Sequence, residues 1–425
     1  MTTAGINWQS VTGLSGDALK AEIFSIMQQA SWDLQTGEID DPTLLGVVPR
    51  LAELMEDRPE LASFGEAFSA IARSVGLWNY IDTEAANARD ELAAEIAYVP
   101  ELGIVLHREQ LGALNTLLAG QNLILSAPTS FGKSILIDAM LLSNRYSRVA
   151  IVLPTIALLD EFRRRLVRRF GNRFDVLMHH SEIATKDRVI FLGTQERLIN
   201  REDLGRLDLV VVDEFYKLDP ARKDERSVTL NAAVYRLLNL ANQFFFLGPN
   251  IDNVTVSSQS RWKFSFLRTR FSTVAVDTLD LKGVDNKEER LLEEVVREDN
   301  WPALVFVSSP DKANDMASMI VEKNVRVGGG ADLAEWMAIY YGGRWELTEA
   351  VAAGVGVHHG RIPRALASRF VALFNNMTLP ILICTSTLIE GVNTAAKSVL
   401  IYDKAIANRN YDFFTFSNIR GRAGR

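Results

Sequence analysis

The stretch from Asn122 to Met140, NLILSAPTSFGKSILIDAM, constrains the fold more than any other part of the sequence. Its apolar start at 123–125 predicts a buried strand, and helical periodicity takes over from Ile135. The loop between them turns successive backbone N–H groups toward one point, and the following helix adds its positive N-terminal end. Such a concavity suits a polyphosphate, so the stretch predicts a phosphate-binding loop between a strand and a helix.

The loop follows the pattern G-x-x-x-x-G-K-[ST], with Ala127 in place of the first glycine. In this pattern Lys133 reaches the β and γ phosphates, and Ser134 offers its hydroxyl to Mg²⁺. The alternative is a chance match in a glycine-containing turn, which the flanking strand and helix disfavour. The predicted loop residues are Ala127, Pro128, Thr129, Ser130, Phe131, Gly132, Lys133 and Ser134.

An acidic pair, Asp213 and Glu214, ends the apolar strand predicted at 209–212. Two carboxylates at the end of a buried strand are costly unless a cation lies opposite. Mg²⁺ on a nucleotide phosphate supplies that charge, so we expect Asp213 to bind the metal and Glu214 to orient or deprotonate the attacking water. The alternative is that Asp213 caps the next helix.

Two arginines, Arg422 and Arg425, stand three residues apart, so on a helix they would project from one face. Opposite a nucleotide held by the first half of the chain, they would act as arginine fingers, a role worth about 10³ to 10⁵ in rate. Hydrolysis would then require the two halves to close. The alternative is a basic helix end that interacts only with its own dipole.

Composition sets further limits. The 425 residues, 48% of them hydrophobic, suffice for two or three domains with full cores. No apolar run approaches the roughly 18 residues of a membrane span and no signal peptide is recognisable, so we expect a cytoplasmic protein with no membrane partner. Cys384 is the only cysteine, which excludes an intramolecular disulfide and a cysteine-based metal cluster.

A net charge of −7 argues against a uniformly basic surface that coats nucleic acid. Six arginines nevertheless cluster between residues 163 and 173, and apolar residues recur at helical spacing through the same segment. This pattern predicts an amphipathic helix whose outer face is basic, or alternatively a solvated face with no partner. The arginines are Arg163, Arg164, Arg165, Arg168, Arg169 and Arg173, and the apolar residues are Leu159, Phe162, Leu166 and Phe170.

Three domains are predicted: a helical N-terminal domain at 1–97, an α/β domain at 98–275 and a second α/β domain at 276–425. In the first part we expect helices at 16–29, 42–55, 59–75 and 83–97, with Trp32, Trp78 and Tyr80 as packing residues. In the second we expect strands at 123–125, 149–153, 189–192, 209–212 and 244–247, and one or two more within 264–276. In the third we expect strands at 303–307, 355–357, 380–384 and 398–402, and helices at 286–299, 311–322, 331–341 and 363–374.

Taken together, the motifs resemble a superfamily 2 helicase of the DEAD/DEAH type, nearest to the Ski-type branch, over residues 104–425. The matching stretches are LHREQLGAL with Gln110, APTSFGKS (127–134, motif I), LPTIALLDEF (153–162, Ia), GTQERL (193–198, Ib), VVVDEFY (210–216, II), FVSS (306–309, IV), GVGVHHGRIPR (354–364), CTSTLIEGVN (384–393, V) and NIRGRAGR (418–425, VI). The resemblance implies an α/β fold of two tandem RecA-like parallel-sheet domains. The helical N-terminal extension is similar in layout to helicases of bacterial anti-phage systems such as Hachiman.

The resemblance also implies ligands. ATP and Mg²⁺ would be the cofactors, with Gln110, Glu390, Gly391 and Asn418 on the nucleotide in addition to the loop. The partner would be single- or double-stranded nucleic acid, DNA favoured over RNA, together with a partner nuclease or another defence-system subunit. The residues implied to contact nucleic acid are Pro154, Thr155, Thr194, Gln195, Ser308, His359 and Thr385. Taken singly, Gln110 could be a surface residue of a helix. Thr155, Thr194 and Thr385 could be helix or turn caps. We interpret His358 and His359 as structural residues or as contacts to the nucleic-acid strand, and not as a zinc-binding pair.

Three departures from the family pattern stand out. Phe215-Tyr216 follows the acidic pair in place of a small residue and Asp or His, 246–250 replaces the Ser-Ala-Thr motif III, and Asn418 stands where glutamine is usual. Because the family has further elements after motif VI, we expect the chain to be part of a longer protein. The leading interpretation is an ATPase that moves along nucleic acid; the alternatives are a remodeller that does not unwind and a nucleotide-gated clamp.

Overall fold

The computed structural model describes the chain from Thr3 to Ala423 with short gaps. The residues left out of the description are 1–2, 38–41, 220–224, 250, 256–260, 282, 324–328, 343–344, 390–393, 395, 404, 407–408, 412 and 424–425. The chain forms two compact units, Met1–Leu153 with Arg169–Ala275 and Pro154–Arg168 with Val276–Arg425. The domain limits predicted from the sequence stay a prediction.

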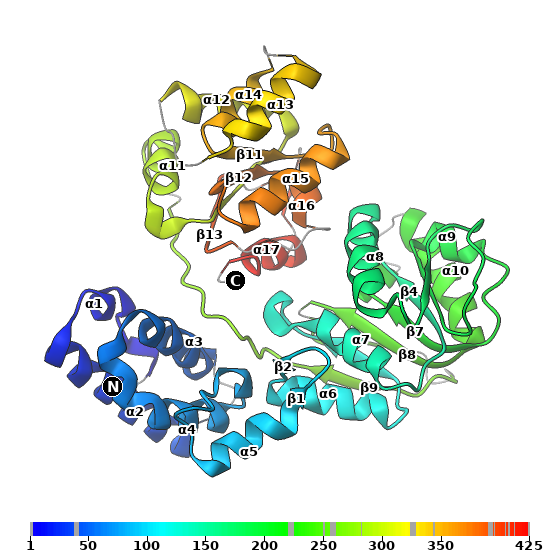
Figure 1. Cartoon of the computed structure of the whole chain (residues 1–425), viewed down its shortest axis with the longest axis horizontal. Helices are drawn as coiled ribbons and strands as arrows, with labels where there is room; N and C mark the ends of the chain where they lie inside the picture. The colour runs from blue at the N-terminus through cyan, green and yellow to red at the C-terminus, as the bar shows by residue number, and fades with distance from the viewer. Residues whose placement is uncertain are drawn as a thin grey trace. The chain divides into compact units, whose positions relative to one another are not determined.

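The N-terminal part of the first unit is helical, as predicted, and is coloured blue to cyan in Figure 1. Its core is lined by apolar side chains of α2, α3 and α4. The helix predicted at 83–97 begins only at Ala88, because the Asn87 side chain caps the backbone N–H groups of Arg89 and Asp90. The elements are η1 (Thr3–Gly5), α1 (Trp8–Thr12), α2 (Gly16–Thr36), α3 (Pro42–Asp57), η2 (Pro59–Phe64), α4 (Gly65–Val75), η3 (Trp78–Tyr80) and α5 (Ala88–Ala97).

The prediction that Trp32 is a packing residue is wrong, since its side chain is 62% exposed. The buried residues of α2 end at Ala30, and a residue two positions further on points away from that face of a helix. Trp78 and Tyr80 are partly buried, and Tyr80 packs against the helical core.

A seven-stranded parallel sheet follows, in the order β5-β6-β4-β7-β8-β3-β9. Its central strands are almost continuously apolar, as expected of strands covered on both faces. The expected strands are confirmed. The stretch 264–276, for which one or two strands are expected, contains one strand, and the three-residue strand β5 was not predicted. The strands are β3 (Leu123–Ser126), β4 (Arg148–Val152), β5 (Asp175–Leu177), β6 (Val189–Gly193), β7 (Leu207–Val212), β8 (Ala241–Gly248) and β9 (Ser265–Arg268). The other elements are β1 (Tyr98–Val99), β2 (Ile104–Val105), α6 (Arg108–Leu118), α7 (Lys133–Leu142), α8 (Ile156–Phe170), α9 (Gln195–Ile199), η5 (Phe215–Leu218) and α10 (Glu225–Leu240).

The register of this sheet brings several predicted motifs to one edge. Ser126 at the end of β3 pairs with Gly248 of β8, and Val212 at the end of β7 pairs with Phe246 of the same strand. Only β8 therefore separates the strand that leads to the phosphate loop from the strand that leads to the acidic pair. Since all three strands are parallel, both motifs leave the sheet at its carboxyl edge.

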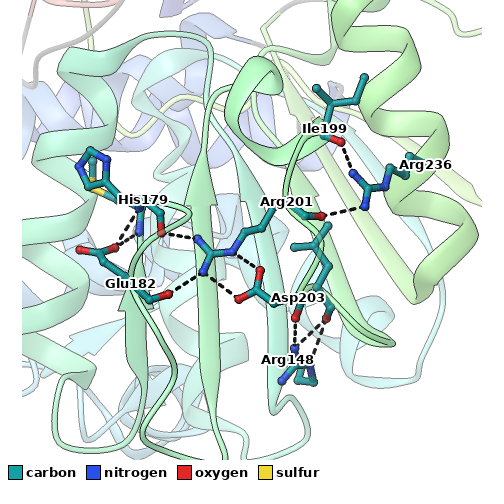
Figure 2. A network of polar contacts seen from close by, with 9 residues as sticks. Arg148, His179, Glu182, Ile199, Arg201, Asp203 and Arg236 are labelled. Carbon is teal, nitrogen blue, oxygen red and sulfur yellow. Dashed lines mark hydrogen bonds and ion pairs between the residues drawn. The ribbon is translucent and has the colours of Figure 1, made fainter.

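Near β5, at the end of the sheet away from β3, the buried guanidinium of Arg201 connects two loops by hydrogen bonds (Figure 2). It donates to the carbonyl oxygens of His179 and Glu182 at 2.8 and 3.0 Å and pairs with the Asp203 carboxylate at 2.6 Å. Arg236 of α10 in turn donates to the Arg201 carbonyl oxygen at 2.7 Å. The network ties the loop after β5 to the segment between α9 and β7, so the buried charge is well compensated.

The second unit contains a four-stranded parallel sheet in the order β11-β12-β10-β13. The expected strands and helices are confirmed, except that the helix expected at 286–299 ends at Val295. The elements α14, α16, β14 and β15 were not predicted. Both sheets and the helical N-terminal part thus give the α/β class of tandem RecA-like domains. The elements are α11 (Lys287–Val295), η7 (Glu298–Asn300), β10 (Ala303–Phe306), α12 (Pro310–Glu322), α13 (Ala331–Tyr341), α14 (Glu346–Ala352), β11 (Val355–His358), α15 (Arg364–Asn375), β12 (Ile381–Cys384), α16 (Ser386–Ile389), β13 (Ser398–Ile401), β14 (Ala405–Ile406), β15 (Arg409–Asn410) and α17 (Phe413–Arg420).

Nowhere in the described part of the chain is there a helix with both the length and the apolar character needed to span a membrane.

Candidate nucleotide site and helicase motifs

The phosphate loop is a tight turn between β3 and α7. Gly132 has φ +78°, and a Cβ atom there would lie 2.6 Å from Gln110 Nε2, so both the backbone conformation and the space require glycine. Lys133, the first residue of α7, donates from Nζ to the carbonyl oxygens of Ala127 and Pro128 at 2.8 and 2.9 Å. The ammonium is therefore held at the loop that the sequence pattern assigns to phosphates.

Gln110 is not a surface residue: it is 4% exposed and bonded to the loop. Its side-chain amide donates to the Phe131 carbonyl oxygen at 2.8 Å. Its other amide atom, Oε1, accepts from the backbone N–H of His107, and the His107 side chain caps the backbone N–H of Gln110 in return. This capping box fixes the start of α6 against the phosphate loop.

His107 is a site residue that the sequence analysis missed. Its Nδ1 accepts from Gln110 N, so Nε2 carries the proton and donates to the Phe131 carbonyl oxygen at 3.2 Å. Burial lowers the pKa of His107 to about 4, the hydrogen bond to Phe131 opposing it, so the ring is neutral at pH 7. A histidine three residues before a glutamine at a helix start is a recognisable capping signal in the sequence.

The acidic pair lies directly after β7. Asp213 N donates to Val152 O at 3.1 Å, and Asp213 Oδ1 accepts from Glu214 N at 2.9 Å. Glu214 has φ +52°, a left-handed conformation that non-glycine residues seldom adopt and that clusters at functional sites. Its Oε2 forms an ion pair of 2.6 Å with Nζ of Lys217, a partner that the sequence analysis did not anticipate.

These residues fit a nucleotide with a divalent ion. The loop offers a left-handed turn, an ammonium and a helix start, and the acidic pair leaves the same sheet edge one strand away. Within the described residues no three His, Cys, Asp or Glu side chains gather as a metal site. By the loop pattern and the acidic pair, Ser134 and Asp213 would hold the ion, and phosphate and water would supply its remaining ligands, as is usual for Mg²⁺.

Two departures from the family pattern, Phe215 after the acidic pair and Gly248 within 246–250, are in contact with each other. A Cβ atom on Gly248 would lie 2.8 and 2.9 Å from two atoms of the Phe215 ring, and that ring also stacks on Phe246 at 6.2 Å. The large Phe215 thus occupies the space that the missing side chain of Gly248 leaves open. The segment after β8 is joined to β3 as well, because Ala127 N donates to Gly248 O and Ser126 Oγ bonds to the backbone of Ile251.

The predicted nucleic-acid contacts before residue 200 follow strand ends. Thr194 and Gln195 come after β6 and are only 5% and 4% exposed. Pro154 and Thr155 follow β4, and Thr155 Oγ1 accepts from Leu158 N at 3.4 Å in the first turn of α8. Thr155 therefore has the capping geometry that the alternative interpretation foresees.

The second sheet brings three further candidates to one carboxyl edge. Phe306, His358 and Cys384 are in register, so Ser308, His359 and Thr385 follow neighbouring strand ends. Thr385 N donates to His358 O at 3.1 Å, and Ser308 N donates to the Asp403 carboxylate at 2.8 Å.

His359 is buried and makes structural contacts. Its Nδ1 accepts from Arg361 N, so Nε2 donates to Asn314 Oδ1 at 3.1 Å. Burial, helped by Arg361, lowers the pKa of His359. Burial also lowers the pKa of His358 to about 4. Both rings are therefore neutral at pH 7.

The helical placement of Arg422 is wrong. Helix α17 ends at Arg420, Arg422 N donates to Ile419 O in the turn that follows, and Ala423 pairs with Ala396. A glycine directly after the last helical residue favours such an exit. Arg422 is 8% exposed, and Asn418 lies within α17 and is half-buried. Arg425, Glu390 and Gly391 lie outside the described residues.

Several arginines of the predicted basic face make contacts within the protein. Arg165 lies over the Phe162 ring at 4.2 Å, Arg169 pairs with Asp138, and Arg173 donates to Asn144. Arg173 also lies beyond the end of α8 at Phe170. The apolar face of this helix is confirmed, since Leu159, Phe162, Leu166 and Phe170 are buried.

Residues 107–243 of the chain match the DEAD/DEAH box helicase family. Among similar proteins, Anti-bacteriophage protein B of Escherichia coli (strain K12) is 35% identical over 393 residues, 88% of this chain and 53% of that protein. ATP-dependent DNA helicase Hel308 of Thermoplasma volcanium is 22% identical over 70% of this chain and 47% of its own length. Helicase POLQ-like of Homo sapiens is 23% identical over 73% and 33%. The chain thus spans about half the length, or less, of these curated relatives.

Proposed function

We propose that this chain is the motor part of a nucleic-acid helicase or translocase that hydrolyses ATP. The observation that supports it most is the common edge of the first sheet, where Lys133 after β3 and Asp213 after β7 are separated by a single strand. A phosphate grip and a metal-binding carboxylate at that distance suit one nucleoside triphosphate.

In this proposal each residue has one task. Lys133 and the first-turn N–H groups of α7 would bind the phosphates, and Ser134 and Asp213 would hold Mg²⁺, which would supply positive charge to the phosphoryl group. Gln110 is assigned to the base by the family resemblance alone, since its side-chain amide is bonded to His107 and Phe131 in this structure. Glu214 orients the water and takes its proton, for which its carboxylate must exchange the ion pair with Lys217. Arg422 and Arg425 are assigned, by the family resemblance, to stabilising the transferring group.

Nucleic acid would be held by the residues that follow strand ends, among them Thr155, Thr194, Ser308 and Thr385. Contacts from hydroxyls and backbone N–H groups to phosphates carry little sequence information, so binding should be sequence-tolerant and weaken steeply with salt. We favour DNA over RNA, which the names of the Hel308 relatives support.

The similarity to an anti-bacteriophage protein supports a role in defence against phage, with a nuclease or another defence subunit as partner. A cytoplasmic location is part of the same proposal, because the nucleic acid of an infecting phage is met there.

Steady-state ATP turnover, with and without single- and double-stranded DNA and RNA, tests the proposal. We expect stimulation by nucleic acid, and a loss of at least about 10²-fold in turnover for Glu214→Gln, since the amide cannot accept the water's proton. Arg206→Gln changes an exposed charge away from the site and serves as the control. Turnover of Glu214→Gln equal to that of the parent would remove the mechanism. Nucleotide-dependent DNA affinity with negligible turnover in the parent would favour the clamp, and turnover without strand separation the remodeller.

A further inference from the structure

The segment Phe271–Thr273, called here the strap, touches both the phosphate loop and the N-terminal helices. It follows β9, the strand beside β3, and Thr269 N donates to Ser126 O at 2.9 Å just before it. About 140 residues of sequence separate the strap from the loop, and no local pattern in the sequence announces the contact. None of its residues has a role in the function proposed above.

On the loop side the strap holds Ser130 by two hydrogen bonds. Thr273 Oγ1 donates to the Ser130 carbonyl oxygen at 2.9 Å, and the two hydroxyls of Ser130 and Ser272 lie 3.0 Å apart. Because Ser272 Oγ donates its only proton to Val274 O, Ser130 is the donor in the hydroxyl pair. The carbonyl oxygen and the hydroxyl of Ser130, a central residue of the loop, are therefore both bonded to the strap.

On the other side the strap is part of the helical core. Phe271 is 2% exposed and belongs to the cluster formed by side chains of α2, α3 and α4. Tyr80 Oη donates to the Thr273 carbonyl oxygen at 2.6 Å. Thr273 thus connects the N-terminal helices to the loop through its own two oxygen atoms.

The His107 side chain contacts both the strap and the phosphate loop. Its ring stacks on Phe271 at 4.6 Å with an angle of 26°, and meets the Phe131 ring edge-on at 4.7 Å. Phe131 is fully buried, and its carbonyl oxygen accepts from His107 and Gln110. Ser130 and Phe131 are consequently fixed by groups that are themselves packed against the N-terminal helices.

We propose that the strap is a positioning element of the nucleotide site, through which the N-terminal helical region sets the affinity of the phosphate loop for nucleotide. The inference rests on the proposed nucleotide site and assigns the helical region a task in it. A loop held in its binding conformation loses less freedom when the phosphates bind, so affinity falls when the strap contacts are removed.

The test measures the dissociation constant for a fluorescent ATP analogue, the KM and kcat for ATP, and the unfolding temperature of the whole chain. Thr273→Val keeps the branched side chain but removes the donor to Ser130, and should raise the dissociation constant and KM about three- to tenfold while kcat changes less. Thr273→Ser restores the hydroxyl and should restore the affinity. Thr116→Val removes an exposed hydroxyl bond to the Gly112 carbonyl oxygen in the C-terminal half of α6, and should leave the affinity unchanged.

Tyr80→Phe approaches the strap from the helical side and keeps the packed ring. It should raise the dissociation constant about two- to fivefold, whereas Tyr98→Phe, at an exposed position, should not. The effect of the Tyr80→Phe and Thr273→Val pair should be smaller than the product of the single effects, since both act through Thr273.

The results separate the two ideas. Parent-like affinity of both Thr273→Val and Tyr80→Phe, with only a lower unfolding temperature, would overturn the strap inference. Lys133→Ala is measured beside them, and parent-like affinity in that variant would instead remove the nucleotide site itself. A Thr273→Val protein that fails to fold leaves the decision to Tyr80→Phe.

Discussion

His107 shows how one side chain can couple stability to pH. Burial lowers the pKa of His107 from 6.5 to about 4. Between these pH values the imidazole is protonated in the unfolded chain but stays neutral in the folded chain. Stability is therefore complete above pH 6.5 and is lost as the pH falls toward 4. At about 1.4 kcal/mol per pKa unit, the free energy of unfolding should fall by about 2 kcal/mol between pH 7 and pH 5 on account of this residue.

Urea unfolding of the parent and of His107→Asn at the two pH values measures this contribution. Asparagine can cap α6 but does not titrate, so its variant should lose about 2 kcal/mol less than the parent over the same interval. Carboxylates and His358 affect both proteins alike and cancel in the difference. His180→Gln, at an exposed position, should keep the slope of the parent. An unchanged slope in His107→Asn would contradict the assignment.

At the scale of the elements, the end of β8 and the turn after β7 depend on a matched pair. In Gly248→Ala the new methyl group meets the Phe215 ring at 2.8 to 2.9 Å and Ile251 at 3.1 Å, so we expect a loss of about 1 to 3 kcal/mol in stability. Phe215→Leu should recover part of that loss in the Gly248→Ala background, because the smaller side chain leaves room for the methyl group.

Thermal unfolding of the single and double variants checks this coupling. Gly112→Ala is the matched control: nothing lies within 4 Å of its Cβ position in α6, and alanine there should stabilise the helix by about 0.5 to 1 kcal/mol. Strictly additive losses in the double variant would show that the two positions do not share one space.

The elements also show what local sequence can predict. The strands and the phosphate loop carry their own periodicity and turn residues, so neighbouring residues in the sequence predict the strand at 123–125 and the place of Lys133. The three-residue spacing of Arg422 and Arg425 predicts that the helix continues through them. The helix α17 instead ends at Arg420, because Gly421 follows it and favours a helix end. Three-residue β5 is too short for a periodic signal. The strap contact with Ser130 is a tertiary contact between distant segments, and neither segment is unusual by itself.

For the whole molecule, the division into two units makes the site of nucleotide binding testable without separating them. Gln110, Lys133 and Asp213 all belong to the first unit. Calorimetry of the chain should therefore resolve unfolding of two units, and Mg²⁺ with ADP should raise the transition of the first, by about 2.7 kcal/mol in stability when ADP is at 100 times its dissociation constant.

The Gly248→Ala variant identifies the transition of the first unit, since its added methyl group lies in that unit and lowers that transition alone. Lys133→Ala should lose the shift that ADP causes, because the ammonium no longer meets the phosphates, while both transitions remain. A shift confined to the second unit, or one that persists in full in Lys133→Ala, would mean that nucleotide binds elsewhere. If the shift instead follows the first unit and disappears with Lys133, the loop between β3 and α7 is where the nucleotide is held, and the pH slope of His107 and the affinity set through Thr273 become two readouts of one site.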